Sequence, residues 1–415
     1  MNAPLLMSLD ASDWGLAPTG WQHSRFSAAQ RARMSVIHDG IDTDRVRPGD
    51  APEEELVTYV ARNLEPYRGF HVFMRAIPEI QRRRPNARIV IVGGTGNISV
   101  SIVKRLLEQG HEVTCYNRSG GAPEGARTLQ GDRHNLAEYE ATMQREKFDA
   151  AIDMVAFTKA DAESNLRAFR GIGQLVHCST VCTYGIDYDW LPVTEDHPLR
   201  PTTGYARGKA ESDAVYLAAY YDEGFPVTII KPSTTHGPKQ GLIRQIAWDY
   251  SWIDRIRKGK PILVCGDGFA LHQFLHVDDA ALGFAGVIGK EKCIGQVYNL
   301  VKRGYITWAG YHRTAMQVIG REVELVGIPL ADLRALEVPA SGICEDIFAH
   351  NVIYSAEKLF RDVPEFRPSY TLETAIQDIL AAMDAAGRVP NSDEIEWEDA
   401  IIAAQRGVRE AVVKS

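Results

Sequence analysis

Three side chains in the middle of the chain have the types and spacing needed for proton transfer at a carbon–oxygen bond. Thr180 ends a predicted buried strand in HCSTVCTYG, and Tyr205 and Lys209 stand four residues apart in YARGK. Positions i and i+4 share one face of a helix, so Lys209 can lie beside Tyr205 and lower its pKa. Such a tyrosine exchanges a proton with a hydroxyl group while a hydride moves to or from a nicotinamide, and Thr180 can hydrogen-bond the same oxygen. We therefore take Thr180, Tyr205 and Lys209 as the candidate catalytic set.

A glycine-rich turn upstream predicts where the nicotinamide cofactor binds. The stretch RIVIVGGTGNIS reads as a strand, a turn with Gly93 and Gly96, and the start of a helix over 98–109. Glycine permits the tight turn and lets backbone N–H groups approach a pyrophosphate at the helix N-terminus. One such turn is a weak signal, but here the strand, turn, amphipathic helix and second strand (111–117) follow in order. The cofactor-binding residues expected in this turn are Gly93, Thr95, Gly96, Asn97 and Ile98.

The end of the second strand indicates which cofactor is preferred. An acidic residue there would accept hydrogen bonds from the adenosine ribose, but this chain has Asn117 and Arg118. Arg118 can pair with a 2′-phosphate, which favours NADP over NAD; the alternative is a solvated surface arginine. Asp132, in LQGDRHN, follows a third predicted strand. It either holds the adenine amino group or caps a helix that begins near Leu136.

The elements that must position these residues alternate between strand and helix. Strands are predicted over 148–157, 173–185 and 225–233, and a helix over 204–223. This alternation predicts a parallel sheet with right-handed crossovers. After about residue 234 the pattern becomes mixed, with loops and short helices. The fold class expected is therefore α/β, with a Rossmann-type doubly wound sheet and a smaller C-terminal substrate domain.

Composition narrows the class of protein. The chain has 415 residues, 45% of them hydrophobic and 24% charged, and a net charge of −8. The acidic balance argues against nucleic acid or an anionic membrane as the main partner. Six scattered cysteines without zinc spacing predict reduced thiols and no metal site. The N-terminus lacks the features of a signal peptide, and no apolar run approaches the roughly 20 residues of a membrane span, so we expect a cytoplasmic protein.

Residues 88–385 resemble the extended short-chain dehydrogenase/reductases, the NAD-dependent epimerase/dehydratase family. The matching stretches occur in family order: GGTGNIS, GDRHN, CSTVCTYG, TEDHPLRPTTGYARGKAE, VTIIKPSTTHGPKQ, GDGFALHQFLHVDDAA and GQVYNLV. The resemblance implies a cofactor domain over 88–233, to which parts of 270–300 return, a substrate region over 234–390, and a helical tail over 391–415. It also implies catalysis by Thr180, Tyr205 and Lys209. The further cofactor contacts that it implies are Tyr205, Lys209, Pro232 and Ser233.

Departures from the family pattern bear on the reaction. The third glycine of the turn is Ser99, which is still small enough for close helix packing. Dehydratases carry Asp-Glu after the catalytic threonine, whereas this chain has Val181-Cys182, so 4,6-dehydration is not expected. Many nucleotide-sugar members have a diphosphate-binding Arg-Asp pair where this chain has His272-Gln273, which argues against a nucleotide-diphosphate sugar. Cys182 and His272 are candidate substrate contacts, although a buried Cys182 without a chemical role is the simpler interpretation.

The first 87 residues resemble a different family, the retaining glycosyltransferases of family 4 with the GT-B fold. SRFSAAQRARMSVIHDGIDTDRVRP and VTYVARNLEPYRGFHVFMRAIPEIQRRRPNARIVIVGG match the linker and opening β-α-β unit of the donor-binding domain. Arg62 and Arg68 fall near that family's diphosphate contacts, but the later donor site and nearly all of the acceptor domain are absent. The chain therefore reads as a fusion joined inside the strand ARIVIVGG, which either family could use.

The function expected is NAD(P)-dependent epimerisation or oxidoreduction at a hydroxyl-bearing carbon of a sugar or nucleotide-sugar-like substrate. Two alternatives stay open. The first is a non-catalytic protein, because some relatives are RNA-associated proteins of plastids; the retained Thr180, Tyr205 and Lys209 and the acidic charge argue against it. The second is a glycosyltransferase, which the truncated donor site argues against. The partner expected is a small sugar-like molecule, not nucleic acid or a membrane, and a homodimer stays open.

Overall fold

The computed structural model describes residues 13–17, 20–37 and 87–414, and the chain divides into two compact units, Met1–Arg75 and Ala76–Ser415. In the first unit, strands β1 (Gly15–Ala17) and β2 (Met34–Val36) pair in parallel and are connected through helices α2 (Gly20–Ser24) and α3 (Ala28–Arg31). Ala17, Phe26 and Met34 form its small core. None of these elements was assigned in the sequence analysis, because three-residue strands and one-turn helices leave almost no periodicity.

The second unit is built on a seven-stranded, all-parallel sheet. The order across the sheet is β13-β8-β7-β6-β3-β4-β5. Its strands are β3 (Arg88–Val92), β4 (Glu112–Asn117), β5 (Arg127–Gln130), β6 (Ala150–Asp153), β7 (Gln174–Cys178), β8 (Val227–Pro232) and β13 (Val297–Leu300). The first six follow the Rossmann order, and β13 extends the sheet by one strand. The predicted α/β class and parallel sheet are confirmed.

Helices cover both faces of this sheet. The helices are α5 (Asn97–Glu108), α6 (Leu136–Glu146), α7 (Lys159–Ala168), α8 (Gly204–Glu223) and α10 (Val277–Val287). Helix α5 packs against α10, and α7 packs against both α6 and α8. Alternate residues of β3 enter different cores: Ile89 and Ile91 join one cluster with Phe284, while Val90 and Val92 join another with Tyr216. This alternation is why the strand is apolar at every position.

Two predicted strands end earlier than their apolar patterns suggested. Strand β6 stops at Asp153 because its side-chain Oδ1 accepts the N–H groups of Val155 and Ala156, which turns the chain. Strand β7 stops at Cys178, and Thr180 caps the short 3₁₀ helix η2 (Val181–Tyr184). In both places a polar side chain hydrogen-bonds nearby backbone N–H groups, which are then not available for pairing with the neighbouring strand.

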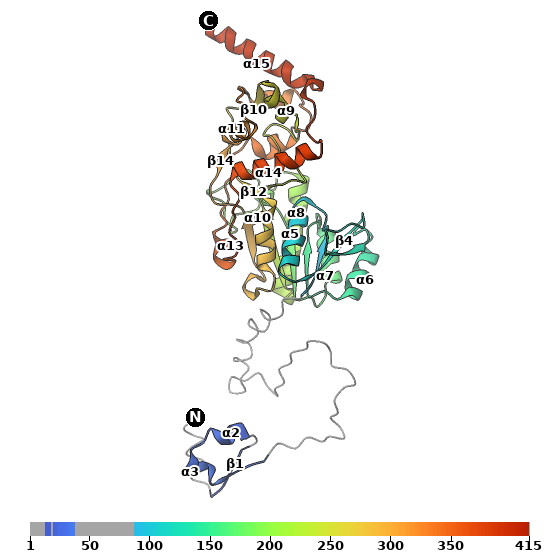
Figure 1. The fold of residues 1–415 in the computed structure, drawn as a ribbon, viewed down its shortest axis with the longest axis vertical. Coiled ribbons are helices and arrows are strands. Elements are labelled where there is room, and N and C mark those ends of the chain that lie inside the picture. Colours follow the sequence, from blue (N-terminus) through green and yellow to red (C-terminus); the bar gives the residue numbers. More distant parts are fainter. Residues whose placement is uncertain (1–12, 18–19, 38–86, 415) are drawn as a thin grey trace. The chain divides into compact units, whose positions relative to one another are not determined.

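The mixed pattern after residue 234 becomes a second region built from pairs of short strands and further helices, which lies against one end of the sheet (Figure 1). Its strand pairs are β9 (Thr234–His236) with β12 (Phe274–His276), β10 (Ile262–Cys265) with β15 (Leu325–Ile328), and β11 (Leu271–His272) with β14 (Ile306–Thr307). Its helices are α9 (Ser251–Lys258), η3 (Glu291–Cys293), α11 (Trp308–Ile319), α12 (Leu330–Ala335), the π-helix η4 (Cys344–Phe348), α13 (Glu357–Asp362), α14 (Leu372–Ala385), η5 (Ser392–Glu394) and α15 (Glu396–Lys414). No helix among the described residues is long and apolar enough to cross a membrane, and no metal-binding cluster occurs among them.

The strand at the junction of the two resemblances belongs to the sheet. β3 pairs with β4 along one edge and with β6 along the other, so both of its edges are occupied. In a glycosyltransferase-like arrangement the predicted strand over 57–63 would pair beside it. That strand and the predicted helix over 68–85, with Arg62 and Arg68, lie outside the described residues.

We predict that the first 85 residues are dispensable for the fold and for cofactor binding. A chain beginning at Asn86 retains every strand of the seven-stranded sheet, and no edge of β3 is left for an upstream strand. Its melting temperature and its dissociation constant for NADPH should match those of the full chain. Loss of folding or of NADPH binding on truncation would show that the upstream segment is part of the enzyme's core.

Candidate functional site

The glycine-rich turn leaves no room for a side chain at two of its glycines. Gly93 has a φ of +84°, and a methyl group on it would lie 2.6 Å from Val155 Cγ1. A methyl group on Gly94 would lie 2.5 Å from Cys115 Sγ. Close packing excludes a side chain at both positions, and the positive φ of Gly93 disfavours one there as well. Ser99, in place of the third glycine, is buried on the inner face of α5, so the helix still packs closely.

Helix α5 begins at this turn without a side-chain cap. Its N-cap is Gly96, and among the described residues no side chain caps the N–H groups of the first turn. The first N–H groups of a helix lack partners within the helix and carry its partial positive charge, which is the arrangement that binds phosphate. Asn97 and Ile98 occupy this first turn, as predicted, and the residues present fit a dinucleotide.

The same turn is connected to the segment that follows β9. The Asn97 side chain donates to Gln240 Oε1 at 2.9 Å and accepts from the Gln240 backbone N–H at 3.1 Å. The Lys239 ammonium donates to the carbonyl oxygen of Thr95. Lys239 and Gln240 lie in the GPKQ segment of the family resemblance, but no role was predicted for either. A local sequence pattern cannot show that residues more than 140 positions apart meet.

The residues expected at the adenosine end lie on two adjacent loops. Asn117 is buried at the end of β4, and its amide group donates to the Gly121 carbonyl at 2.6 Å. Arg118 follows it and is exposed. Asp132 lies in the loop after β5, where its carboxylate accepts the His134 N–H at 3.0 Å. The N-cap of α6 is Asn135, so the alternative of Asp132 as a helix cap is wrong, and its second carboxylate oxygen is left for another partner.

The candidate catalytic set comes together at the carboxyl ends of β6 and β7. Thr180 Oγ1 accepts the backbone N–H of Cys182 at 3.2 Å, which leaves the hydroxyl proton free to point elsewhere. Tyr205 lies in the first turn of α8 and is hydrogen-bonded to Thr180. The Lys209 ammonium is buried and donates to the carbonyl oxygens of Ala156 at 2.7 Å and Cys178 at 2.6 Å.

The electrostatics of Tyr205 differ from the sequence expectation. The ring is half exposed, but its hydroxyl group lies within the crowded site, and withdrawal from water raises its pKa. The hydrogen bond with Thr180 opposes this shift without cancelling it. Burial also lowers the pKa of Lys209. The expected lowering of the tyrosine pKa by Lys209 is therefore wrong, because desolvation dominates.

A cavity of about 210 Å³ lies beside Thr180. Cys182, Pro232, Ser233 and His272 line it with Thr180, so five of the predicted site residues meet here. Val181 and Gln273, two of the departures from the family pattern, also line it. The remaining lining residues, to which the sequence patterns gave no role, are Thr234, Thr235, Gln240, Trp248, Ile343, Ile347, Phe348, Val352 and Tyr354. The hydroxyl oxygen of Ser233 is buried and has no hydrogen-bond partner within the part of the chain that the structure describes, which is consistent with a ligand supplying one.

The two candidate substrate contacts are both neutral at physiological pH. Burial raises the pKa of Cys182 and keeps it a thiol, which supports the interpretation without a nucleophilic role. Burial lowers the pKa of His272 to about 3, and its Nε2 lies 2.7 Å from Thr234 Oγ1. The neighbouring Gln273 is used structurally, since its amide group binds the backbone of Tyr354 in both directions.

Comparison with known proteins identifies the two segments of the chain. The profile of the NAD dependent epimerase/dehydratase family matches residues 89–300, and that of the glycosyl transferase family 4 group matches residues 1–46. A 2′-dehydrokanamycin reductase of Streptomyces kanamyceticus is 26% identical over 77% of this chain and 92% of its own. A chloroplast stem-loop binding protein of Arabidopsis thaliana is 26% identical over 56% of this chain and 63% of its own.

Solved structures show the same fold. A UDP-glucuronic acid 4-epimerase from Bacillus cereus, in complex with UDP-glucuronic acid and NAD, has a TM-score of 0.59 at 16% identity and covers 72% of this chain and 99% of its own. A dTDP-glucose 4,6-dehydratase from Bacillus anthracis, in complex with NAD, has a TM-score of 0.58 at 20% identity over 76% and 99%. From the family profile over half of the sequence and the Rossmann-type sheet, the chain belongs to the NAD-dependent epimerase/dehydratase family of extended short-chain dehydrogenase/reductases, preceded by a segment similar to a family 4 glycosyltransferase.

Proposed function

We propose that the chain is an NADP-dependent reductase or epimerase that acts on a carbonyl or hydroxyl group of a sugar carrying no diphosphate. The observation that carries the chemistry is the meeting of Thr180, Tyr205 and Lys209 beside a cavity at the carboxyl edge of the sheet. Family membership supports an NAD(P)-dependent enzyme.

In the reducing direction the substrate's carbonyl oxygen lies between Thr180 and Tyr205. Thr180 donates a hydrogen bond, because a carbonyl oxygen can only accept one and the bond from the Cys182 N–H leaves the hydroxyl proton available. Tyr205 donates its proton to the oxygen as the carbonyl carbon receives a hydride, so a C–H and an O–H bond form. A nicotinamide held at this site would supply the hydride for reduction and, in epimerisation, would hold it between its removal and its return. Lys209, held by two carbonyl oxygens, places a positive charge near the phenolate that remains.

The cavity's lining supports a substrate without a diphosphate. None of its sixteen residues is a lysine, an arginine or a carboxylate. A diphosphate buried without a cation or a helix N-terminus would lose its hydration without compensation. His272 and Gln273 stand where nucleotide-sugar relatives keep the Arg-Asp pair, and neither supplies a charge. The name of the relative 2′-dehydrokanamycin reductase gives as substrate a dehydrokanamycin rather than a nucleotide sugar.

The substrate proposal predicts a preference between two kinds of ketone. The kcat/KM for NADPH oxidation should be at least about tenfold higher with phosphate-free keto sugars and keto-aminoglycosides than with dTDP-4-keto-6-deoxyglucose. The diphosphate of the latter finds no cation among the residues that line the cavity, and a loss of about 1.4 kcal/mol in binding gives that factor. dTDP-glucose should yield no 4-keto-6-deoxy product, because Val181-Cys182 supply no acid–base pair. A preference for the nucleotide-linked ketone would overturn the substrate class while leaving the oxidoreductase assignment in place.

Tyr205 is predicted to be the proton donor. Tyr205→Phe removes only the hydroxyl group and should lower kcat for ketone reduction by about 10²–10⁴-fold. Because burial raises its pKa, Tyr205 stays protonated through the neutral range. The wild-type rate of reduction should therefore be flat from roughly pH 6 to pH 9 and fall only at higher pH. A phenylalanine variant within a few-fold of the wild type would rule out this role.

Arg118 is predicted to select NADP. Its exposed side chain follows β4, where a 2′-phosphate would lie, and charge-assisted bonds of this kind contribute about 1.5–3 kcal/mol. Arg118→Ala should weaken NADP binding about tenfold or more and leave NAD binding unchanged, as measured by fluorescence titration. Arg127→Ala is the matched control. Arg127 is also exposed, but it begins β5 at the amino-terminal edge of the sheet, away from the end of β4, and it pairs with Glu146. Tighter binding of NAD than of NADP by the wild type would contradict the assignment.

A further inference from the structure

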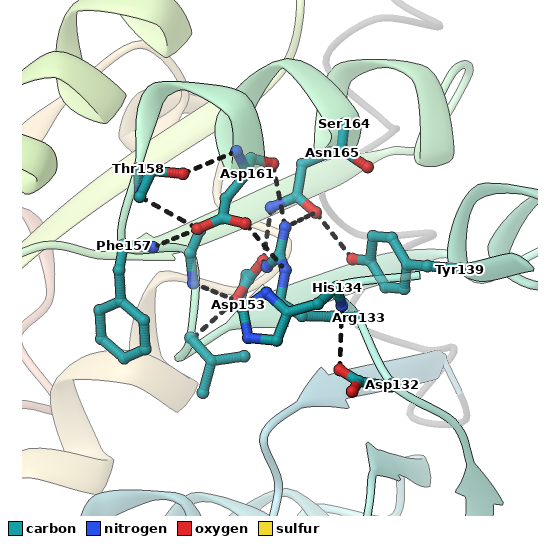
Figure 2. A network of polar contacts seen from close by, with 12 residues as sticks. Asp132, Arg133, His134, Tyr139, Asp153, Phe157, Thr158, Asp161, Ser164 and Asn165 are labelled. Atoms are coloured by element: carbon teal, nitrogen blue, oxygen red, sulfur yellow. Dashed lines mark hydrogen bonds and ion pairs between the residues drawn. The ribbon is translucent and has the colours of Figure 1, made fainter. Parts of the chain in front are cut away.

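A buried guanidinium group lies between the adenosine end of the site and the catalytic set. Arg133 follows Asp132 in the loop after β5, yet its side chain is only 4% exposed. It donates to Asp153 Oδ2, and it lies 3.5 Å from Asp161 Oδ1 while donating to the Asp161 carbonyl oxygen at 3.0 Å. Figure 2 shows this side chain enclosed by Asp153, Asp161 and Asn165. The three partners come from the end of β6 and from α7.

Both carboxylates also bind the same short stretch of backbone. Asp153 Oδ1 accepts the N–H groups of Val155 at 2.7 Å and Ala156 at 2.9 Å. Asp161 Oδ2 accepts the next two, from Phe157 at 2.9 Å and Thr158 at 3.0 Å. Four successive N–H groups of residues 155–158 are thus bound by the two acids that Arg133 holds in place (Figure 2).

This stretch of backbone is one wall of the catalytic set. The carbonyl oxygen of Ala156 accepts from the Lys209 ammonium at 2.7 Å. The Phe157 ring lies 4.6 Å from that ammonium and 6.1 Å from the Tyr205 ring. Helix α8 approaches so closely that a methyl group on Gly208 would lie 2.3 Å from the Phe157 carbonyl oxygen. A shift of residues 155–158 would therefore displace Lys209.

We propose that Arg133 is a positioning residue, which acts through Asp153 and Asp161 on residues 155–158 and so fixes where the Lys209 ammonium lies. Its role differs from that of an ion pair that only stabilises the fold. One carboxylate oxygen of each acid accepts backbone N–H groups of residues 155–158, which form the wall beside Lys209. A planar guanidinium reaches both acids at once, which a lysine ammonium cannot do from the same backbone position. The inference rests on the proposed function, in which Lys209 acts beside Tyr205, and on the contact between Lys209 and the cofactor that the family resemblance implies.

A double-mutant cycle on NADPH affinity tests this role without a known substrate. Arg133→Lys keeps the charge but loses the second contact, and Asp161→Asn keeps the shape but weakens the acceptor. Each should raise the dissociation constant for NADPH at least about threefold in the wild-type background. Neither should change it measurably in a Lys209→Met background, since residues that act through one group are not additive. Asp161→Asn serves on its own if Arg133→Lys fails to fold.

Arg244→Lys is the matched control. Arg244 and Glu398 form an equally buried ion pair, with both side chains fully inaccessible and no residue of the pair lining the cavity. This variant should lower the melting temperature in both backgrounds and leave the NADPH dissociation constant unchanged. Equal weakening by Arg133→Lys in both backgrounds, or no weakening in either, would overturn the positioning role. Failure of the wild type to bind NADPH would instead overturn the proposed function, and this inference with it.

Discussion

The ammonium group of Lys209 is a positive charge buried between two backbone carbonyl oxygens, and the catalytic end of the sheet is organised around it. Removing such a charge from water is costly unless polar groups replace its hydration. The carbonyl groups of Ala156, in the segment that follows β6, and of Cys178, at the end of β7, do so. They can meet at one point only because β6 and β7 are parallel and adjacent, with their carboxyl ends at the same edge.

Much of the fold and part of the site could be predicted from local patterns. The alternation of apolar strands and amphipathic helices was enough for the parallel sheet, and the predicted helix over 204–223 agrees with α8. The i, i+4 spacing placed Tyr205 and Lys209 on one helix face, and the glycine spacing identified the turn before α5. These features depend on residues a few positions apart, where chain geometry alone determines proximity.

The remaining features depend on contacts between distant parts of the chain. Arg133 lies 20 positions from Asp153 and 28 from Asp161, and an arginine beside a predicted loop is ordinarily a surface residue. The sign of the Tyr205 pKa shift depends on how much water reaches its hydroxyl group, which spacing does not reveal. The wall of the cavity formed by Ile343, Ile347 and Phe348 comes from around a π-helix, an element without a recognisable sequence period.

The bridge between Asn97 and Gln240 joins two sites that are usually considered separately. Asn97 begins the helix at the cofactor turn, and Gln240 lines the cavity beside Thr180. A change of Asn97 would release or reorient Gln240 on the wall of this cavity. A substitution at the turn that alters Asn97 is therefore also a change to the wall of the cavity, and a library that varies this residue has to vary Gln240 together with it.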